Sequence, residues 1–200
     1  MIEFTGDQQL AAQQREVIAA ACYDLASAEG FDAVTLEAVA ARAGMPTETV
    51  LQHFDEPDEL IEYIIVGEIG QVMAETAILF SSGTSTPDVI VEVFAYSYRR
   101  LSDTLTFREL LDPDRVRLMA HLRGERPETL ILSLDFLSEE IRTLGVRTGT
   151  PVDDADAAAE FFVRLMLSLL VSPHLGPDLS EDGALEALVR RWLLPGMFGG

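Results

Sequence analysis

The chain has 200 residues, 48% of them hydrophobic, and it carries 34 acidic residues against 14 basic ones for a formal net charge of −20. The apolar fraction is too high for a disordered chain. The length allows one domain, or a small domain joined to a larger one, with a core of ordinary size.

The scarce residue types exclude several kinds of site and location. All 14 basic residues are arginine, and Cys22 is the sole cysteine, which excludes an intrachain disulfide and a cysteine-based zinc site. The first residues lack the basic and apolar regions of a signal peptide. The longest apolar stretch, 161–171, is 11 residues long and contains Arg164, whereas a membrane span needs about 20 residues. We therefore expect a soluble, cytoplasmic protein that does not enter a membrane.

Three helices are expected in the N-terminal part. Apolar residues recur at helical spacing over residues 8–29, and Gly30 ends that helix as a C-cap residue. A short helix over 36–43 follows, with Thr35 as its N-cap. After a tight turn at Gly44, a second short helix is expected over 47–54.

The rest of the chain is also expected to be helical. A long helix begins near 55–58, where an aspartate can cap it and a proline suits the first turn, and it runs to about Phe80. The Ser/Thr/Gly/Pro-rich stretch 81–87 is interpreted as a loop. Further helices are expected at about 88–104, 107–122, 127–145, 153–172 and 181–193. The sequence thus predicts an all-α protein of about nine helices.

The first three helices have the arrangement of a helix-turn-helix unit. At the turn, Ala43-Gly44-Met45 supplies a small residue, a position of positive φ and a buried apolar residue, which lets two helices cross closely. The second short helix of such a unit presents its N-terminal half to the major groove of DNA.

A series of residues at fixed spacings lies between Arg15 and Leu60. It comprises Gly30-Phe31, Thr35, Val39-Ala40, Ala43-Gly44-Met45, Thr49-Val50 and His53-Phe54. The series resembles the tetracycline-repressor (TetR) family of bacterial transcriptional regulators, and residues 190–196 resemble the terminal helix of actinobacterial members. The resemblance implies a homodimer that binds duplex DNA, with a helix-turn-helix domain over 1–56 and a larger ligand-binding and dimerisation domain over 57–200.

Three positions depart from the family pattern. Leu51 stands where the family usually has tyrosine and Pro57 where it usually has lysine, both of which contact DNA phosphates in the family. Glu48 occupies a position that is often glycine or small. Residues 1–63 hold 13 acidic residues and two arginines, a net charge of −11. Because DNA affinity draws on neutralised phosphates, the charge disfavours DNA binding while the fold favours it.

The candidate DNA contacts lie on the two short helices. They are Thr35, Arg42, Thr47, Glu48, Thr49, Leu51, Gln52 and His53. Glutamine suits adenine edges, although ordinary solvent-facing polarity also explains the polar residues of the second helix. The acidic run 55–59 has two compatible interpretations: it weakens phosphate contact, and it stabilises a helix N-terminus.

The larger domain is rich in aromatic and methionine residues, which suit an apolar ligand pocket but are also typical of an ordinary core. The candidate pocket residues are Phe94, Tyr98, Met119, His121, Phe136, Phe162 and Met166. The helix over 153–172 carries an apolar stripe wider than one facing core needs, which with the last helix predicts a two-fold four-helix interface. The candidate interface residues are Phe161, Leu165, Leu169, Leu185, Leu188 and Trp192.

Catalytic and metal sites find little support. His53, His121 and His174 are too far apart in sequence to form a helical metal pair, and Cys22 lies on an apolar stripe. No nucleophile elbow, phosphate loop or dinucleotide fingerprint occurs, so we expect no cofactor, no metal and no enzymatic activity. Two hypotheses remain. One is a TetR-like repressor controlled by a small apolar ligand; the other is a TetR-like dimer that has lost ordinary DNA binding and acts as a small-molecule or protein-binding module.

Overall fold

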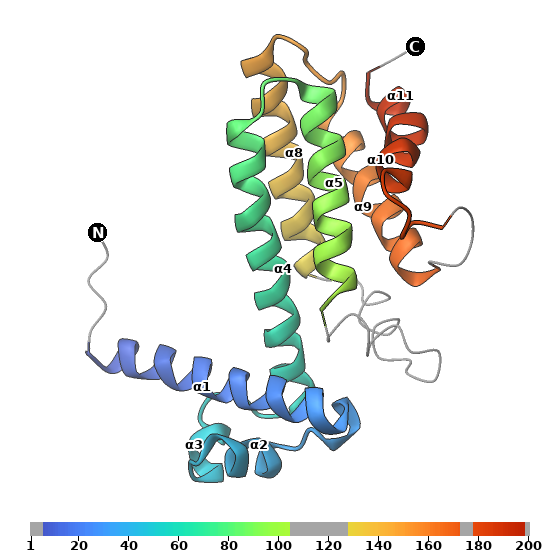
Figure 1. Ribbon diagram of the computed structural model, residues 1–200. Helices are drawn as coiled ribbons and strands as arrows, with labels where there is room; N and C mark the ends of the chain where they lie inside the picture. The colour runs from blue at the N-terminus through green and yellow to red at the C-terminus, as the bar shows by residue number, and fades with distance from the viewer. Residues whose placement is uncertain (1–5, 105–127, 173–177, 199–200) are drawn as a thin grey trace. The chain divides into compact units, whose positions relative to one another are not determined.

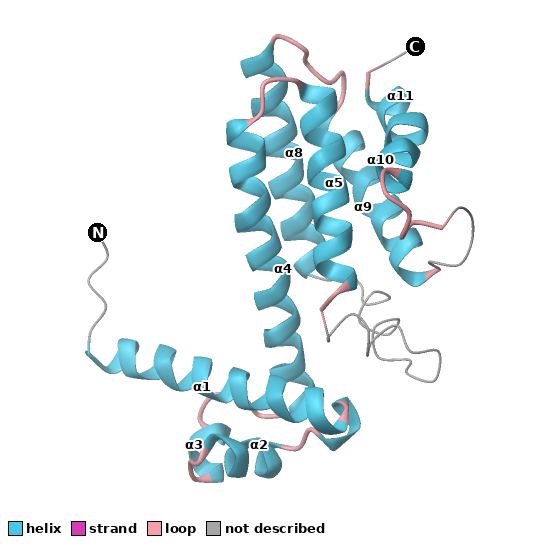
Figure 2. Ribbon diagram, viewed as in Figure 1, coloured by secondary structure: helices cyan, strands magenta, loops and turns pink. Residues whose placement is uncertain are grey.

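The computed structural model describes residues 6–104, 128–172 and 178–198, and within these ranges every regular element is a helix (Figures 1 and 2). The expected all-α class is therefore confirmed. The helix expected over 107–122 lies outside the described residues. The helices are α1 (Gly6–Glu29), α2 (Leu36–Ala43), α3 (Thr47–Leu51), α4 (Pro57–Ser82), α5 (Thr86–Ser102), α8 (Glu128–Thr148), α9 (Ala155–Val171), α10 (Ala184–Leu188) and α11 (Leu194–Met197).

The chain divides into two compact units, Met1–Glu68 and Ile69–Gly200. The division falls inside α4, whereas the sequence prediction placed it at 56/57, where that helix begins. The first turns of α4 belong with the helices before them: Leu60 and Ile64 are buried, and the Tyr63 ring packs edge-on against Phe54 with 5.4 Å between centroids.

The N-terminal unit is organised around the apolar face of α1. Ile18, Cys22 and Leu25 are buried at helical spacing, and α2 and α3 pack beneath this helix (Figure 1). Val39 of α2 and Val50 of α3 are fully buried. Burial of each such side chain stabilises the fold by roughly 1.5–3 kcal/mol. The apolar faces of α1, α2 and α3 therefore stabilise this unit.

The end of α1 and both ends of α2 occur as predicted from the sequence. Gly30 has φ +83° at the end of α1, and Gly44 has φ +68° as the C-cap of α2. The Thr35 hydroxyl accepts a hydrogen bond from the backbone N–H of Ala38 at 3.1 Å, which caps α2. The cap and the left-handed glycine together fix where α2 begins and ends.

In the C-terminal unit, α5 is the central core helix. Figure 1 shows α4, α5 and α8 side by side, with α9 to α11 beyond α5. Ile90, Val93 and Phe94 of α5 are fully buried, and the Phe94 ring meets Phe162 of α9 edge-on with 4.8 Å between centroids. A helix with buried residues on most of its sides, as α5 has, needs neighbours on both sides, and α8 and α9 supply them.

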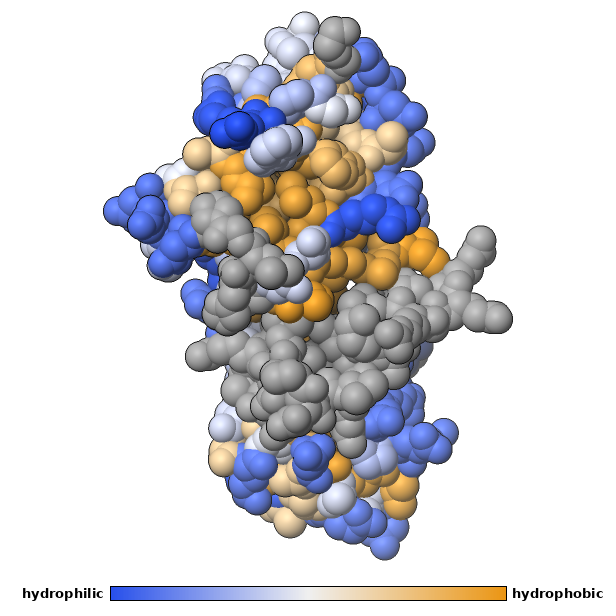
Figure 3. Space-filling model, turned by 90° about the vertical axis from the view of Figure 1, so that its right-hand side faces the viewer, coloured by the Kyte–Doolittle hydropathy of each residue, from blue (hydrophilic) through white to orange (hydrophobic). Residues whose placement is uncertain are grey.

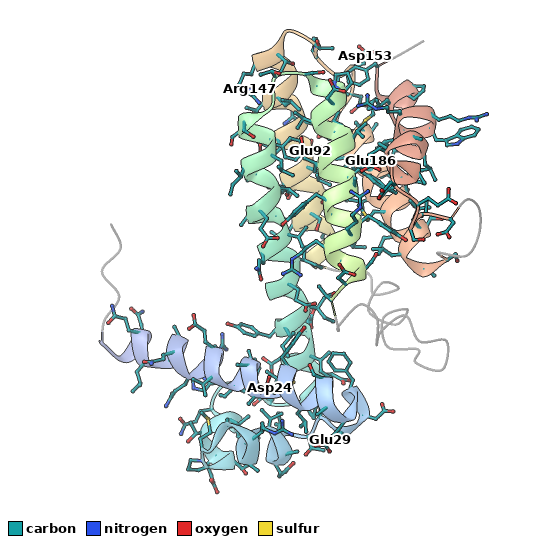
Figure 4. The ribbon with its side chains drawn as sticks, in the orientation of Figure 1. Asp24, Glu29, Glu92, Arg147, Asp153 and Glu186 are labelled. Atoms are coloured by element: carbon teal, nitrogen blue, oxygen red, sulfur yellow. The ribbon has the colours of Figure 1, made fainter. Side chains whose placement is uncertain are left out.

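Arg147, at the end of α8 (Figure 4), holds the connection between α4 and α5. Its guanidinium donates to the carbonyl oxygen of Gly83 at 2.6 Å and to that of Phe80. The loop itself is only 83–85, shorter than the expected 81–87. The difference arises because Pro87 lies in the first turn of α5, where its missing N–H has no helical partner to lose.

By length and composition alone, one helix among the described residues, α4, is apolar enough to cross a membrane. This helix does not stand out as a continuous apolar stretch in the sequence, because Glu62, Glu68 and Glu75 interrupt its apolar residues. The apolar window of this helix is 28% buried, and the helix supplies the buried side chains Leu60 and Phe80.

Candidate nucleic-acid interface

The turn between α2 and α3 brings two short helices together as a helix-turn-helix unit requires. The N–H of Gly44 donates to the carbonyl of Ala41, and that of Met45 to the carbonyl of Ala40 at 3.1 Å. Helix α3 ends at Leu51 rather than at the expected Phe54, because the N–H of His53 turns back to the carbonyl of Val50 at 2.9 Å. The candidate recognition helix is thus a little over one turn long.

The outward face of α3, as we call it here, consists of Glu48, Leu51 and Gln52. All three are exposed, and their i, i+3, i+4 spacing places them on one side of the helix. Val50, on the other side, is fully buried. Of the other candidate contacts, Thr35 and Arg42 are exposed, whereas Thr47, Thr49 and His53 are half-buried.

His53 is tied to α1 by two hydrogen bonds. Its ring Nε2 lies 3.0 Å from Oε1 of Gln14, and its backbone carbonyl accepts from Nη2 of Arg15 at 3.3 Å. One ring nitrogen is therefore already used inside the unit, which leaves Nδ1 for any DNA contact. Neither interpretation of His53 from the sequence, a DNA contact or ordinary solvent-facing polarity, predicts this anchoring.

Arg15 also packs on aromatic rings. Its guanidinium carbon lies 5.4 Å from the centroid of Phe54 and 5.9 Å from that of Tyr63, within the range of cation–π attraction. No sequence motif marks Arg15 or Gln14 as anchors of His53, because their partners lie 38 or more positions away.

Arg42, the other basic residue of this unit, pairs with Glu29 at the end of α1 (Figure 4). The Nη2–Oε1 distance is 3.3 Å, and the side chains are 38% and 57% exposed. A surface pair of this kind contributes about 0–1 kcal/mol, so a phosphate can compete for the arginine. Both arginines of a unit that holds 14 acidic residues over 1–68 are thus in contact with the unit's own groups.

The acidic run before α4 has a structural use. The carboxylate of Glu59 accepts a hydrogen bond from the backbone N–H of Asp55 at 2.8 Å. A first-turn glutamate that reaches back in this way satisfies a donor the helix itself leaves unpaired. Glu59 thus ties the chain before α4 to the first turn of that helix.

The pocket candidates fall largely in the core of the C-terminal unit. Phe94, Tyr98, Phe162 and Met166 are buried, and half-buried Phe136 meets Phe80 with 6.3 Å between ring centroids. Met119 and His121 lie outside the described residues.

A polar cluster links α4 to α5. Glu75 accepts from the hydroxyl of Tyr96 at 2.9 Å and from the amide of Gln71 at 3.0 Å, and it lies 3.4 Å from Nε of Arg100. The Tyr96 hydrogen bond is the main cause that holds the pKa of Glu75 below its usual value, and the same contact raises the pKa of Tyr96. The polar groups of this cluster are thus paired with one another.

The interface candidates divide into two groups. Phe161 and Trp192 are 41% and 62% exposed, while Leu165 and Leu188 are half-buried. Leu169 and Leu185 belong to the subunit's own core, at 9% and 0% exposed, so they face inward. Figure 3 shows a continuous apolar area over the side of the C-terminal unit where α9 to α11 lie.

The described residues hold no group of three His, Cys, Asp or Glu side chains that could bind a metal ion. Burial raises the pKa of Cys22 to about 12, which keeps the thiol protonated near neutral pH. Neither observation points to chemistry in the N-terminal unit. A capped helix-turn-helix with an outward face is the arrangement with which many regulators bind DNA.

The family follows from the comparisons. Residues 18–64 match the model of the tetR family of bacterial regulatory proteins, which covers the helix-turn-helix and the start of α4. Residues 18–64 thus match this family, and the described helices have the fold of TetR-family structures.

Several solved structures share the fold over nearly the whole chain. The TetR family repressor AlkX from Dietzia sp., implicated in biodegradation of n-alkanes, is 20% identical, with a TM-score of 0.67 over 92% of this chain and 97% of AlkX. FadR from Bacillus subtilis, solved with stearoyl-CoA, is 16% identical, with a TM-score of 0.62 over 92% and 98%. SmeT, the repressor of a Stenotrophomonas maltophilia multidrug efflux pump, is 20% identical, with a TM-score of 0.63 over 92% and 90%. No curated protein matches the sequence.

Proposed function

We propose that this TetR-family regulator is a cytoplasmic homodimeric repressor. Paired α3 helices enter successive major grooves of duplex DNA, and binding of a small apolar ligand in the C-terminal unit shifts the spacing of the pair. The observation that carries the DNA-binding part is the outward face of α3, supported on α2 by the Thr35 cap and the left-handed Gly44.

The ligand class is inferred from the candidate pocket residues of the sequence and from the relatives. Phe94, Phe162 and Met166 offer soft apolar surface, which suits an acyl or alkyl chain. FadR was solved with stearoyl-CoA and AlkX is implicated in n-alkane degradation, which supports a ligand with a long hydrocarbon part. The ligand requires no cofactor or metal.

The homodimer is inferred from the exposed apolar residues of the last helices. Phe161 on α9 and Trp192 after α10 leave large aromatic surface in water, which is typical of a contact with another chain. A two-fold arrangement would pair α9 and the C-terminal helix with their counterparts and would cover both residues.

The test of the regulator is a selection of fragments from genomic DNA of the source organism, with the full-length protein at low salt. Recovery of a palindromic site with half-sites about one helical turn apart is the expected result. Recovery of no enriched sequence at any salt concentration would remove the DNA-binding part of the proposal.

The alternative is a TetR-like dimer that binds a protein or a small molecule without reading DNA. It is favoured by one observation: both arginines of the N-terminal unit contact the unit's own groups, while 14 acidic residues surround them. Such a surface attracts basic partners and repels phosphates. Failure of the genomic selection, together with an intact dimer and a stabilising ligand, is the outcome that this alternative requires.

A further inference from the structure

The outward face of α3 is unusual in its chemistry. Glu48, Leu51 and Gln52 present a carboxylate, an isobutyl group and a carboxamide, with no cation among them. Arg42 is paired with Glu29, and Arg15 with the His53 carbonyl, so no ion pair between described residues neutralises Glu48. The carboxylate of Glu48 is therefore free to act on whatever α3 approaches.

A bare carboxylate in the major groove discriminates strongly between bases. Guanine presents two acceptors there, and thymine presents an acceptor and a methyl group. Neither base can therefore donate a hydrogen bond to the carboxylate. Adenine presents an amino donor beside the N7 acceptor, whereas cytosine presents its N4 amino group without an adjacent acceptor. A carboxylate thus accepts a hydrogen bond most favourably at cytosine, less favourably at adenine because the N7 acceptor lies beside the amino group, and is left unpaired or repelled at guanine and thymine.

From this arrangement we infer that Glu48 is a specificity-determining residue that selects cytosine at one position of each half-site. Leu51, one turn away and 47% exposed, is placed to contact a thymine methyl group beside it. The inference rests on the proposed DNA binding and adds to it the class of sequence that is bound. The preference arises from repulsion as well as attraction: guanine and thymine offer the carboxylate no donor, and the N7 acceptor of adenine opposes it.

The test is a selection from random duplexes at low salt with three full-length proteins: the wild type, Glu48→Gln and Glu37→Gln. Glu37 is also exposed, lies on α2, and carries the same charge, so its variant controls for the loss of one negative charge. We expect the wild type and Glu37→Gln to enrich cytosine at the same position. Glu48→Gln should lose that preference and shift toward adenine, which glutamine reads.

Binding titrations on two duplexes that differ only at that base pair quantify the effect. The wild type should prefer cytosine by roughly ten-fold, and Glu48→Gln should prefer it by less than two-fold. An unchanged preference in Glu48→Gln would overturn the inference while leaving DNA binding in place. Absence of binding by all three proteins would overturn both.

A second readout uses the methyl group. Replacing the neighbouring thymine by uracil removes only that methyl, which should weaken binding of the wild type and leave Leu51→Ala unaffected. Equal sensitivity of the two proteins to this replacement would overturn the contact between Leu51 and the thymine methyl group.

Discussion

Nη2 of Arg42 donates to Oε1 of Glu29 at 3.3 Å, and this contact holds one of only two basic side chains in a unit with 14 acidic ones. The pair joins the end of α1 to the last turn of α2. A phosphate that approaches α2 therefore meets an arginine with a carboxylate already beside it, and the two anions compete for one cation.

Glu29→Gln should release Arg42 and strengthen binding to duplex DNA. If the freed arginine gains a phosphate contact, the log–log salt dependence should steepen by about 0.9 for each subunit. Fluorescence anisotropy across a salt series measures both quantities. Glu37→Gln removes the same charge without freeing an arginine, so it should raise affinity less and leave the slope unchanged. Equal slopes for the two variants would contradict the competition.

Arg15→Ala should destabilise the N-terminal unit. The change removes two cation–π contacts and a charged hydrogen bond to the His53 carbonyl, an expected loss of about 1–2 kcal/mol. Hydrogen exchange at the amides of α3 and of the turn after it should report the loss. Arg15→Lys keeps the charge but not the planar stacking group, so it should fall between the wild type and alanine. Identical exchange in all three proteins would exclude the anchoring role.

Tyr96→Phe should make the unfolding free energy of the C-terminal unit less dependent on pH in the acidic range. Hydrogen bonding from Tyr96 is the main cause of the lowered pKa of Glu75, so Glu75 contributes stability above its unfolded pKa, about 4.5, and loses it as pH falls through the folded value. The difference in unfolding free energy between the wild type and Tyr96→Phe should be full at pH 6–7 and shrink below about pH 4.5.

Urea unfolding at several pH values measures this difference. In a Glu75→Gln background the titrating group is absent, so Tyr96→Phe should then have the same effect at every pH. A pH-dependent effect that persists in that background would assign the dependence to another group.

Trp192→Asp should yield a folded monomer. Trp192 is 62% exposed, so the subunit loses little when it changes, whereas a two-fold contact would have to bury a carboxylate. Light scattering at micromolar concentration and circular dichroism measure mass and fold together. Leu185→Ala is the contrasting variant, because this residue is fully buried and its truncation should cost about 2–5 kcal/mol of subunit stability. A monomeric wild type would refute the homodimer.

Local signals in the sequence were reliable where one residue decides the geometry. Thr35 as N-cap and Gly44 as the left-handed C-cap follow from side-chain chemistry and backbone sterics, and both occur as expected. The short extent of α3 was not foreseeable in the same way. The helix ends where the N–H of His53 turns back to the carbonyl of Val50, and the His53 ring is held by Gln14 of α1, a residue 39 positions away.

Apolar periodicity alone did not separate core from surface on α9. Phe161, Leu165 and Leu169 all belong to the stripe noted in the sequence, yet Phe161 is 41% and Leu169 only 9% exposed. A helix packed on one side by its own subunit and free on the other shows a wide stripe, and its spacing does not reveal which edge faces inward. The same ambiguity placed fully buried Leu185 among the interface candidates.

The number of residues in the turn between α10 and α11 determines which side chains of the last helix face outward. Val189–Leu193 is a π-helical turn, in which the N–H of Leu194 donates to the carbonyl of Val189, five residues back. Such a turn contains one residue more than an α-helical path, and each residue rotates later side chains by about 100°. Loss of a single residue here would restore a regular helix and rotate buried Met197 away from the core against which it packs. Among related chains, insertions and deletions at this point would therefore change the contact surface more than most substitutions do.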